Sequence, residues 1–242
     1  MDGTDVGARL AAVRARISAA EQAAGRAPGS VRLLLATKTV PPSVVRTALE
    51  ADADRPAGTR PVLLGENRVQ EATVTAAELA DLAPELHLIG PLQSNKVNQA
   101  LRAVCCVETV ATLELAERLA SRCEAGRVLD VMVQVNVSGE PTKAGVPPQE
   151  ARDLALAVGR LSALRLTGFM TVGAHSADQA VVRSGYADLR ALRDAVVGSG
   201  APGTAEAVEL SMGMSADLEA AVAEGASIVR LGSAVFGSRP PA

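Results

Sequence analysis

The amino-acid sequence predicts an α/β protein that folds as one (β/α)8 barrel, the TIM-barrel architecture, with an extra helix at the N-terminus. Short apolar runs alternate with amphipathic segments along the 242 residues, and no linker-like or low-complexity segment divides the chain. This alternation is typical of parallel sheets, and TIM barrels have about 250 residues. An open doubly wound sheet is the alternative, but the chain has no glycine-rich dinucleotide-binding fingerprint. We therefore expect one domain over residues 1–242.

The N-terminal helix is expected near residues 4–24, where apolar residues recur every three or four positions on one face. This stripe consists of Val6, Leu10, Val13 and Ile17. Gly25 and Pro28-Gly29 end the segment. Because few residues follow the last predicted strand, we expect this helix to cover the barrel where the final helix is short.

The strands are predicted from short runs rich in Val, Leu and Ile. They span residues 33–38, 61–65, 86–90, 105–107, 128–137, 164–170, 207–210 and 227–231. Helices are expected in the intervening segments, the first beginning at Pro42 and the last at Ser215. Ser215 is expected to be the N-cap of that last helix, with Asp217 in its first turn.

The composition is that of an ordinary folded protein, and it excludes several classes of function. Hydrophobic residues make up 48% and charged residues 21% of the chain. A net charge of −3 and only one Tyr, two Phe and no Trp provide neither the basic surface nor the stacking side chains that bind nucleic acid. The chain has no apolar segment long enough to span a bilayer and no signal peptide, which predicts a cytoplasmic protein.

The three cysteines do not indicate a metal site or a disulfide framework. Cys105, Cys106 and Cys123 lack the paired spacings of either. We expect the adjacent pair, Cys105 and Cys106, to fill small spaces in the core. No metal ligands are assigned.

Lys38 is the first candidate functional residue, because it ends the first predicted strand and precedes Pro41-Pro42. Functional residues of TIM barrels lie at the C-terminal ends of the strands. Partial burial there makes an amine easier to deprotonate, which suits it to nucleophilic attack or to a Schiff base. The alternative is a lysine whose charged end simply extends to solvent.

Small residues follow the last two strands, where TIM barrels commonly bind phosphate. Ser211-Met-Gly-Met-Ser215 precedes a helix, whose first N–H groups favour an anion, and Gly232-Ser233 follows the eighth strand. Taken singly, Ser215 is an ordinary N-cap and Gly232 an ordinary turn residue. Together they predict a phosphate site.

Arg230 is expected to point into the barrel, because Val229 and Leu231 occupy the opposite face of its strand. A buried arginine requires a partner. One hypothesis is a structural ion pair with an interior acid such as Glu209. The other is a ligand, since arginine can contact the ring nitrogen of pyridoxal phosphate. A strand-end lysine, a phosphate site and an inward arginine together indicate pyridoxal 5′-phosphate (PLP).

Several motifs, in order along nearly the whole chain, strengthen this interpretation. They are Ala36-Thr-Lys-Thr39, Gly65-Glu-Asn-Arg-Val-Gln-Glu71, His87-Leu-Ile-Gly-Pro-Leu-Gln-Ser-Asn-Lys96, Val135-Asn-Val-Ser-Gly-Glu140, Lys143-Ala-Gly145, Gly168-Phe-Met-Thr171, Leu210-Ser-Met-Gly-Met-Ser-Ala-Asp217 and Val229-Arg-Leu-Gly-Ser-Ala-Val-Phe-Gly237. With them the chain resembles the pyridoxal phosphate homeostasis protein family (the YggS/PROSC family), whose barrel is like the N-terminal domain of alanine racemase. It departs at Thr37 and Leu64, where serine and phenylalanine are frequent, and at Ser233, where threonine also occurs. None of these changes removes a required chemical group.

The resemblance implies a PLP-binding site with defined roles. Lys38 would carry PLP as a covalent internal aldimine, Arg230 would face the ring nitrogen, Asn67 and Met170 would line the site, and Ser211, Met214, Ser215, Gly232 and Ser233 would surround the phosphate. It further implies a protein of intracellular PLP homeostasis, with PLP and apo PLP-dependent enzymes as partners. We expect a monomer, because the chain has no second domain.

The alternative function is a PLP-dependent amino-acid racemase or related lyase, which needs a second base opposite Lys38. Tyr186 is expected to pack in a helix and His87 to be a hydrogen-bonded core residue, which leaves His175, in a loop near the barrel mouth, as the better candidate. Arginine at the ring nitrogen makes the ring a weaker electron sink. We therefore assign no catalytic residue and favour a carrier.

Other hypotheses explain less. A barrel enzyme acting on a sugar phosphate without a cofactor would leave Lys38 and Arg230 unexplained as a pair. Lys96 and Lys143 are alternative amine sites, but the simpler expectation is that both are solvated loop lysines.

Overall fold

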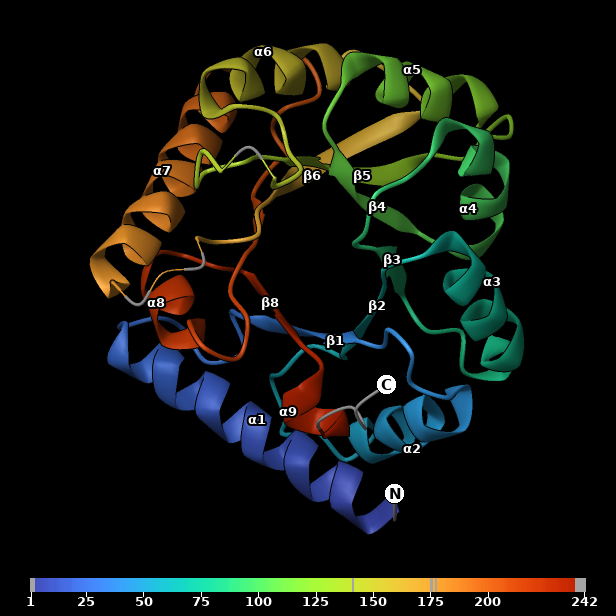
Figure 1. Cartoon of the computed structure of the whole chain (residues 1–242), viewed down its shortest axis with the longest axis vertical. Helices are drawn as coiled ribbons and strands as arrows, with labels where there is room; N and C mark the ends of the chain where they lie inside the picture. The colour runs from blue at the N-terminus through green and yellow to red at the C-terminus, as the bar shows by residue number, and fades with distance from the viewer. Residues whose placement is uncertain (1–2, 141, 175, 177, 238–242) are drawn as a thin grey trace.

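The computed structural model describes residues 3–140, 142–174, 176 and 178–237, which form a closed barrel of eight parallel strands inside a ring of helices (Figure 1). The strands pair in sequence order, and β8 returns to pair with β1. Their bounds are β1 (Arg32–Ala36), β2 (Leu63–Glu66), β3 (Leu86–Leu88), β4 (Cys106–Val110), β5 (Leu129–Gln134), β6 (Leu164–Met170), β7 (Glu209–Ser211) and β8 (Ile228–Leu231). The predicted (β/α)8 architecture is therefore confirmed.

The helices follow the strands around the outside of the barrel. Their bounds are α1 (Gly3–Ala23), α2 (Pro42–Asp52), α3 (Val69–Glu78), α4 (Val97–Ala103), α5 (Leu113–Arg122), α6 (Pro148–Val158), α7 (Gln179–Val197), α8 (Leu218–Ala223) and α9 (Ser233–Phe236), with 3-10 turns η1 (Ala80–Leu82) and η2 (Ser94–Lys96). Helix α1 packs across α2, α8 and the short α9, as predicted (Figure 1). In the described part of the chain, no helix is apolar over a length that would cross a membrane.

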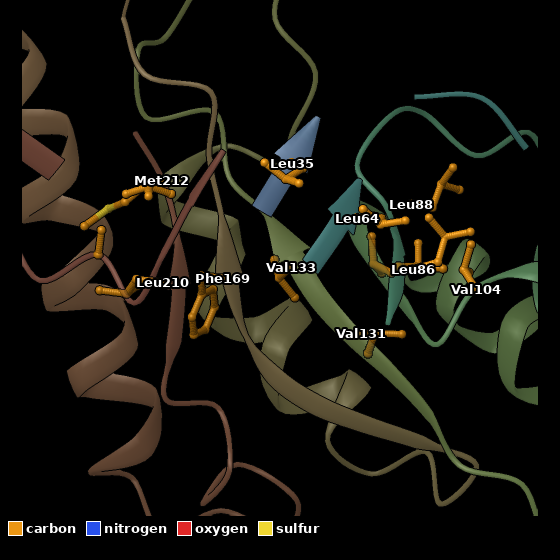
Figure 2. Packing of buried hydrophobic residues seen from close by; sticks show 14 of the residues in the cluster. Leu35, Leu64, Leu86, Leu88, Val104, Val131, Val133, Phe169, Leu210 and Met212 are labelled. Carbon is orange, nitrogen blue, oxygen red and sulfur yellow. The ribbon is translucent and has the colours of Figure 1, made fainter. Parts of the chain in front are cut away.

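Two separate hydrophobic cores result from the alternation of side chains along the strands. The outer core lies between the strands and the helices and includes Leu35, Leu64, Val131 and Phe169, all fully buried (Figure 2). The inner core lies inside the barrel and consists of Leu34, Leu63, Cys106, Met132, Met170 and Ile228. Burial of each such side chain stabilises the fold by about 1.5–3 kcal/mol.

The β4 strand is longer than the predicted segment at 105–107, and it continues to Val110. The strand continues because Val110 still pairs with Val133 of β5. The side chains between have buried partners: Glu108 bonds to His87, and Thr109 donates to the Gly90 carbonyl oxygen. Cys106 is buried as predicted, whereas Cys105 is exposed, so the prediction that both fill the core is wrong for Cys105.

Helix α8 begins at Leu218, so the predicted N-cap role of Ser215 is wrong. Ser215 lies in the preceding turn, where the backbone N–H of Asp217 donates to the Met214 carbonyl. The β7 strand also begins two residues later than predicted, at Glu209, because Ala207 donates its N–H to Thr204 in a turn.

Gly168→Ala tests the close approach of β6 and β7. A Cβ atom at residue 168 would lie 2.0 Å from the backbone oxygen of Glu209, so the two strands would have to separate. We expect the free energy of unfolding to fall by about 1–3 kcal/mol, as in overpacked cores. Urea denaturation followed by circular dichroism measures it.

Gly7→Ala is the matched control, because its Cβ would meet only Ala51 Cβ at 3.5 Å, an ordinary contact. Helix propensity should make this variant slightly more stable, by up to about 1 kcal/mol. Equal stabilities of the two variants would contradict the packing argument.

Candidate functional site

The predicted site residues gather at one mouth of the barrel, because the C-terminal ends of parallel strands lie on one side. The β1, β2, β6, β7 and β8 strands, with the segments that follow them, bring there Lys38, Asn67, Met170, Ser211, Met214, Ser215, Arg230, Gly232 and Ser233. Strand register links neighbours directly: Ala36 pairs with Gly65, and Met170 pairs with Ser211.

Lys38 lies in a tight turn directly after β1. The N–H of Thr37 donates to the Gly65 carbonyl at 3.0 Å, and the N–H of Val40 donates to Thr37 at 2.8 Å. Thr39 has a φ of 63°, a left-handed conformation that is costly for a β-branched residue and is typical of functional sites. The turn therefore holds the half-buried Lys38 in a defined place beside β2.

The end of β8 packs closely against the end of β1. A Cβ atom at Gly232 would lie 2.8 Å from the Ala36 carbonyl oxygen, so only glycine fits there without movement. The exposed Ser233 then begins α9, and the first N–H groups of a helix have no acceptor within it. A hydroxyl and free N–H groups thus lie close to the turn that carries Lys38.

The loop after β7 is held by a buried tyrosine. Tyr186 of α7 donates its hydroxyl to Asp217 at 2.7 Å, and Asp217 accepts the N–H of Met214 at 2.6 Å. Burial, and then the Asp217 carboxylate, raise the pKa of Tyr186, so its hydroxyl stays protonated and has no phenolate to accept a proton. A Cβ atom at Gly173 would lie 2.4 Å from the tyrosine hydroxyl, which shows how closely this site is packed. Tyr186 is a packing residue, as expected, and it also shapes the loop that carries Met214.

A chain of polar side chains crosses the barrel interior from β8 to β3. Arg230 donates from Nη1 to the Ser211 hydroxyl at 3.0 Å and from Nη2 to the Thr171 carbonyl at 2.7 Å. Ser211 donates to Glu108 Oε2 at 2.6 Å. The other carboxylate oxygen of Glu108 is 2.7 Å from Nδ1 of His87. These five groups are buried and partner one another.

The charges along this chain alternate. Full burial raises the pKa of Glu108, but His87, Arg230 and Ser211 lower it by more, so the carboxylate is ionised. Burial lowers the pKa of His87, whereas Cys106, Cys105 and Glu108 raise it well above its usual value. Burial raises the pKa of the Cys106 thiol to about 11, which keeps that thiol neutral and leaves Glu108 as the charged partner of His87.

Glu108, which the sequence analysis missed, supplies the negative charge that Arg230 requires. Burial lowers the pKa of Arg230, and Glu108 is the first of the groups that oppose this effect. The alternative partner, Glu209, pairs instead with Arg60 at 3.3 Å, so the hypothesis of an Arg230–Glu209 pair is wrong. Cys106 and Glu108 are two residues apart and therefore lie on the same face of β4. A predicted strand that extended to Glu108 would have placed this carboxylate inside the barrel.

Two other predictions concern basic residues near the mouth. Lys143 is not a solvated loop lysine: its Nζ donates to Glu140 and to the Gly173 carbonyl, each at 2.8 Å, and its side chain is only 17% exposed. His175, the candidate second base, lies outside the described residues.

Two cavities lie away from the predicted cofactor residues. One of about 240 Å³ is lined by Thr109, Gln134 and other residues near the ends of β3, β4 and β5. A larger one of about 490 Å³ lies between α1 and the loops that precede β1 and β2.

The donor set fits pyridoxal phosphate. Lys38 provides an amine, and the Gly232–Ser233 turn provides a hydroxyl and N–H groups. This turn lies so close to the backbone of Ala36 that a Cβ atom at residue 232 would not fit. Arg230 is fixed by two hydrogen bonds that leave other guanidinium N–H groups for a ligand. An aldehyde, a phosphate and a ring nitrogen each have a complementary partner.

Comparison with known proteins agrees with this arrangement. Residues 9–240 match the family model "Alanine racemase, N-terminal domain". The pyridoxal phosphate homeostasis protein of Pseudomonas aeruginosa is 45% identical over 232 residues, which cover 95% of this chain and 94% of that protein.

Two solved structures are similar over nearly their whole length. A protein from Bifidobacterium adolescentis is 40% identical with a TM-score of 0.89, covering 98% of this chain and 97% of the other. PipY from Synechococcus elongatus with PLP bound is 34% identical with a TM-score of 0.79, covering 96% and 100%. The chain therefore belongs to the pyridoxal phosphate homeostasis protein family, which is built on the barrel of the alanine racemase N-terminal domain.

Proposed function

We propose that this protein binds PLP reversibly, holds it covalently through Nζ of Lys38, and acts as a carrier in intracellular PLP homeostasis. The observation that carries the proposal is the contact between the ends of β8 and β1, which brings Gly232 against Ala36, two residues before Lys38. PLP supplies an aldehyde carbon that an amine can attack. The membership of the family and the PLP bound to PipY support the same ligand.

The remaining residues take positioning roles in this proposal. Arg230 meets the ring nitrogen, Gly232, Ser233, Ser215 and the loop at Met214 surround the phosphate, and Asn67 and Met170 line the ring. Ser211 donates its only hydroxyl hydrogen to Glu108, which favours an indirect role through Arg230.

A carrier without turnover is favoured over a racemase or lyase. Tyr186 donates its hydroxyl to Asp217 and is buried, so it does not offer a base to a substrate. A guanidinium at the ring nitrogen disfavours protonation of the ring and weakens carbanion chemistry. The free thiols suit a reducing cytoplasm, and we propose that a monomer delivers PLP to apo PLP-dependent enzymes.

Lys38→Ala tests the covalent linkage. After incubation with PLP, the wild type should show a visible absorption band that borohydride removes, and peptide mass mapping should find the reduced cofactor on Lys38. The variant should lose the band and keep part of its phosphate-mediated binding, because the phosphate contacts are on other strands. Lys96→Ala should behave as the wild type. A colourless wild type, or a label on another lysine, would contradict the proposal.

Tyr186→Phe tests the support of the loop after β7. Without the hydroxyl, Asp217 loses one of its partners and holds Met214 less firmly. The lost hydrogen bond is to a carboxylate, but it acts on PLP only through the loop, so we expect part of its energy to appear as about a two- to tenfold weaker affinity for PLP, measured by fluorescence titration. Unchanged affinity in a variant of unchanged melting temperature would show that the loop does not contribute to binding.

Solvent deuterium exchange distinguishes a carrier from an enzyme. A panel of L- and D-amino acids is incubated with the PLP-loaded protein in D2O, and exchange at the α-carbon is followed by proton NMR. We expect exchange no faster than with free PLP, because no described residue is assigned as a second base. Appreciable turnover would overturn the carrier assignment.

A further inference from the structure

The polar chain inside the barrel connects the predicted cofactor site with residues far from it. Arg230 and Ser211 come from β8 and β7, whereas Glu108 and His87 come from β4 and β3, on another part of the barrel wall. The Ser211 hydroxyl accepts from the guanidinium and donates to the carboxylate, so it can link the two only in this orientation. The Ser211 hydroxyl therefore forms the hydrogen-bonded connection between Glu108 and Arg230.

The energetics of burial make this link strong. A charged group removed from water is costly unless it is paired, and Glu108 and Arg230 are both almost completely buried. Glu108 has a cationic ring on one side and, through Ser211, a guanidinium on the other. The titratable groups around His87 are Cys105, Cys106, Glu108 and Glu85, and those around Arg230 are Glu108, Tyr186 and Asp217.

We propose that Glu108 is a positioning residue for the cofactor site: braced by His87, it orients Ser211 and thereby fixes the guanidinium of Arg230 toward the ring nitrogen of PLP. This inference rests on the proposed function, because it assigns Arg230 to the cofactor. It gives a role to two buried residues that lie outside the assigned PLP contacts.

Two variants separate charge from geometry. Glu108→Gln removes the negative charge and keeps a similar shape, whereas Ser211→Ala keeps every charge and removes the link. Both should bind PLP about tenfold more weakly, the size of one charge-assisted hydrogen bond. The pH midpoint of the cofactor's visible band should move to lower pH in Glu108→Gln, because a lost negative charge disfavours protonation of the Lys38-linked nitrogen. In Ser211→Ala this midpoint should move less.

Glu21→Gln is the matched control, since Glu21 is a buried carboxylate on α1 that accepts the N–H groups of Gly29 and Val31, away from the barrel interior. It should leave PLP affinity and the spectrum unchanged. Wild-type affinity and pH midpoint in Glu108→Gln would overturn the proposal. If Glu108→Gln does not fold, Ser211→Ala becomes the deciding variant. Wild-type PLP affinity in Ser211→Ala would likewise overturn the proposal.

The pH dependence of stability in the apo protein tests the contact between Glu108 and His87 without PLP. It therefore separates failure of this proposal from failure of the proposed function. The folded-state pKa of His87 is raised, so its contribution to stability is complete below its unfolded pKa of about 6.5 and is lost as the pH rises through the folded value. The apo wild type should therefore lose stability above about pH 6.5 more steeply than apo Glu108→Gln. Parallel pH profiles of the melting temperature would show that Glu108 does not brace His87 and would overturn the proposal.

Discussion

The burial of one guanidinium is the constraint on which the interior of this barrel depends. Arg230 lies on a short strand inside a closed sheet, where water cannot solvate its charge. Arg230 instead donates hydrogen bonds to the Ser211 hydroxyl and the Thr171 carbonyl oxygen. The ionised carboxylate of Glu108 lies one hydrogen bond further away, beyond Ser211. The side chains of the inner core are apolar, and some of them lie in register with this polar chain: Cys106 pairs with His87, and Met170 pairs with Ser211.

Closure of the barrel is equally necessary, because the site joins the first and last strands. Lys38 follows β1 and Ser233 follows β8, and they lie nearly two hundred residues apart in the sequence. Pairing of β1 with β8, and the absence of a side chain at Gly232, bring the two segments together. Helix α1 packs outside this seam against α2, α8 and α9, and it thereby supports the part of the wall that completes the site.

The arrangement explains how a barrel related to an enzyme domain can serve to hold a cofactor. Tyr186, which packs behind the loop after β7, donates its hydroxyl to Asp217, so it has a structural role. Arg230 is paired and fixed, which suits recognition of a ring nitrogen and disfavours its protonation. In the proposed function, these fixed groups favour binding of the cofactor over proton transfer.

The sequence by itself determined the barrel, the strand that presents Lys38 and the inward direction of Arg230, because hydrophobic periodicity and turn residues are local signals. It could not identify Glu108 as the counter-charge, since β3 and β4 meet β7 and β8 across the barrel only after closure. The start of α8 was also predicted wrongly. The Asp217 side chain, held by Tyr186 of a distant helix, accepts the Met214 N–H, and a turn therefore precedes the helix. These features depend on contacts between residues far apart in the chain, and only the tertiary structure decides them.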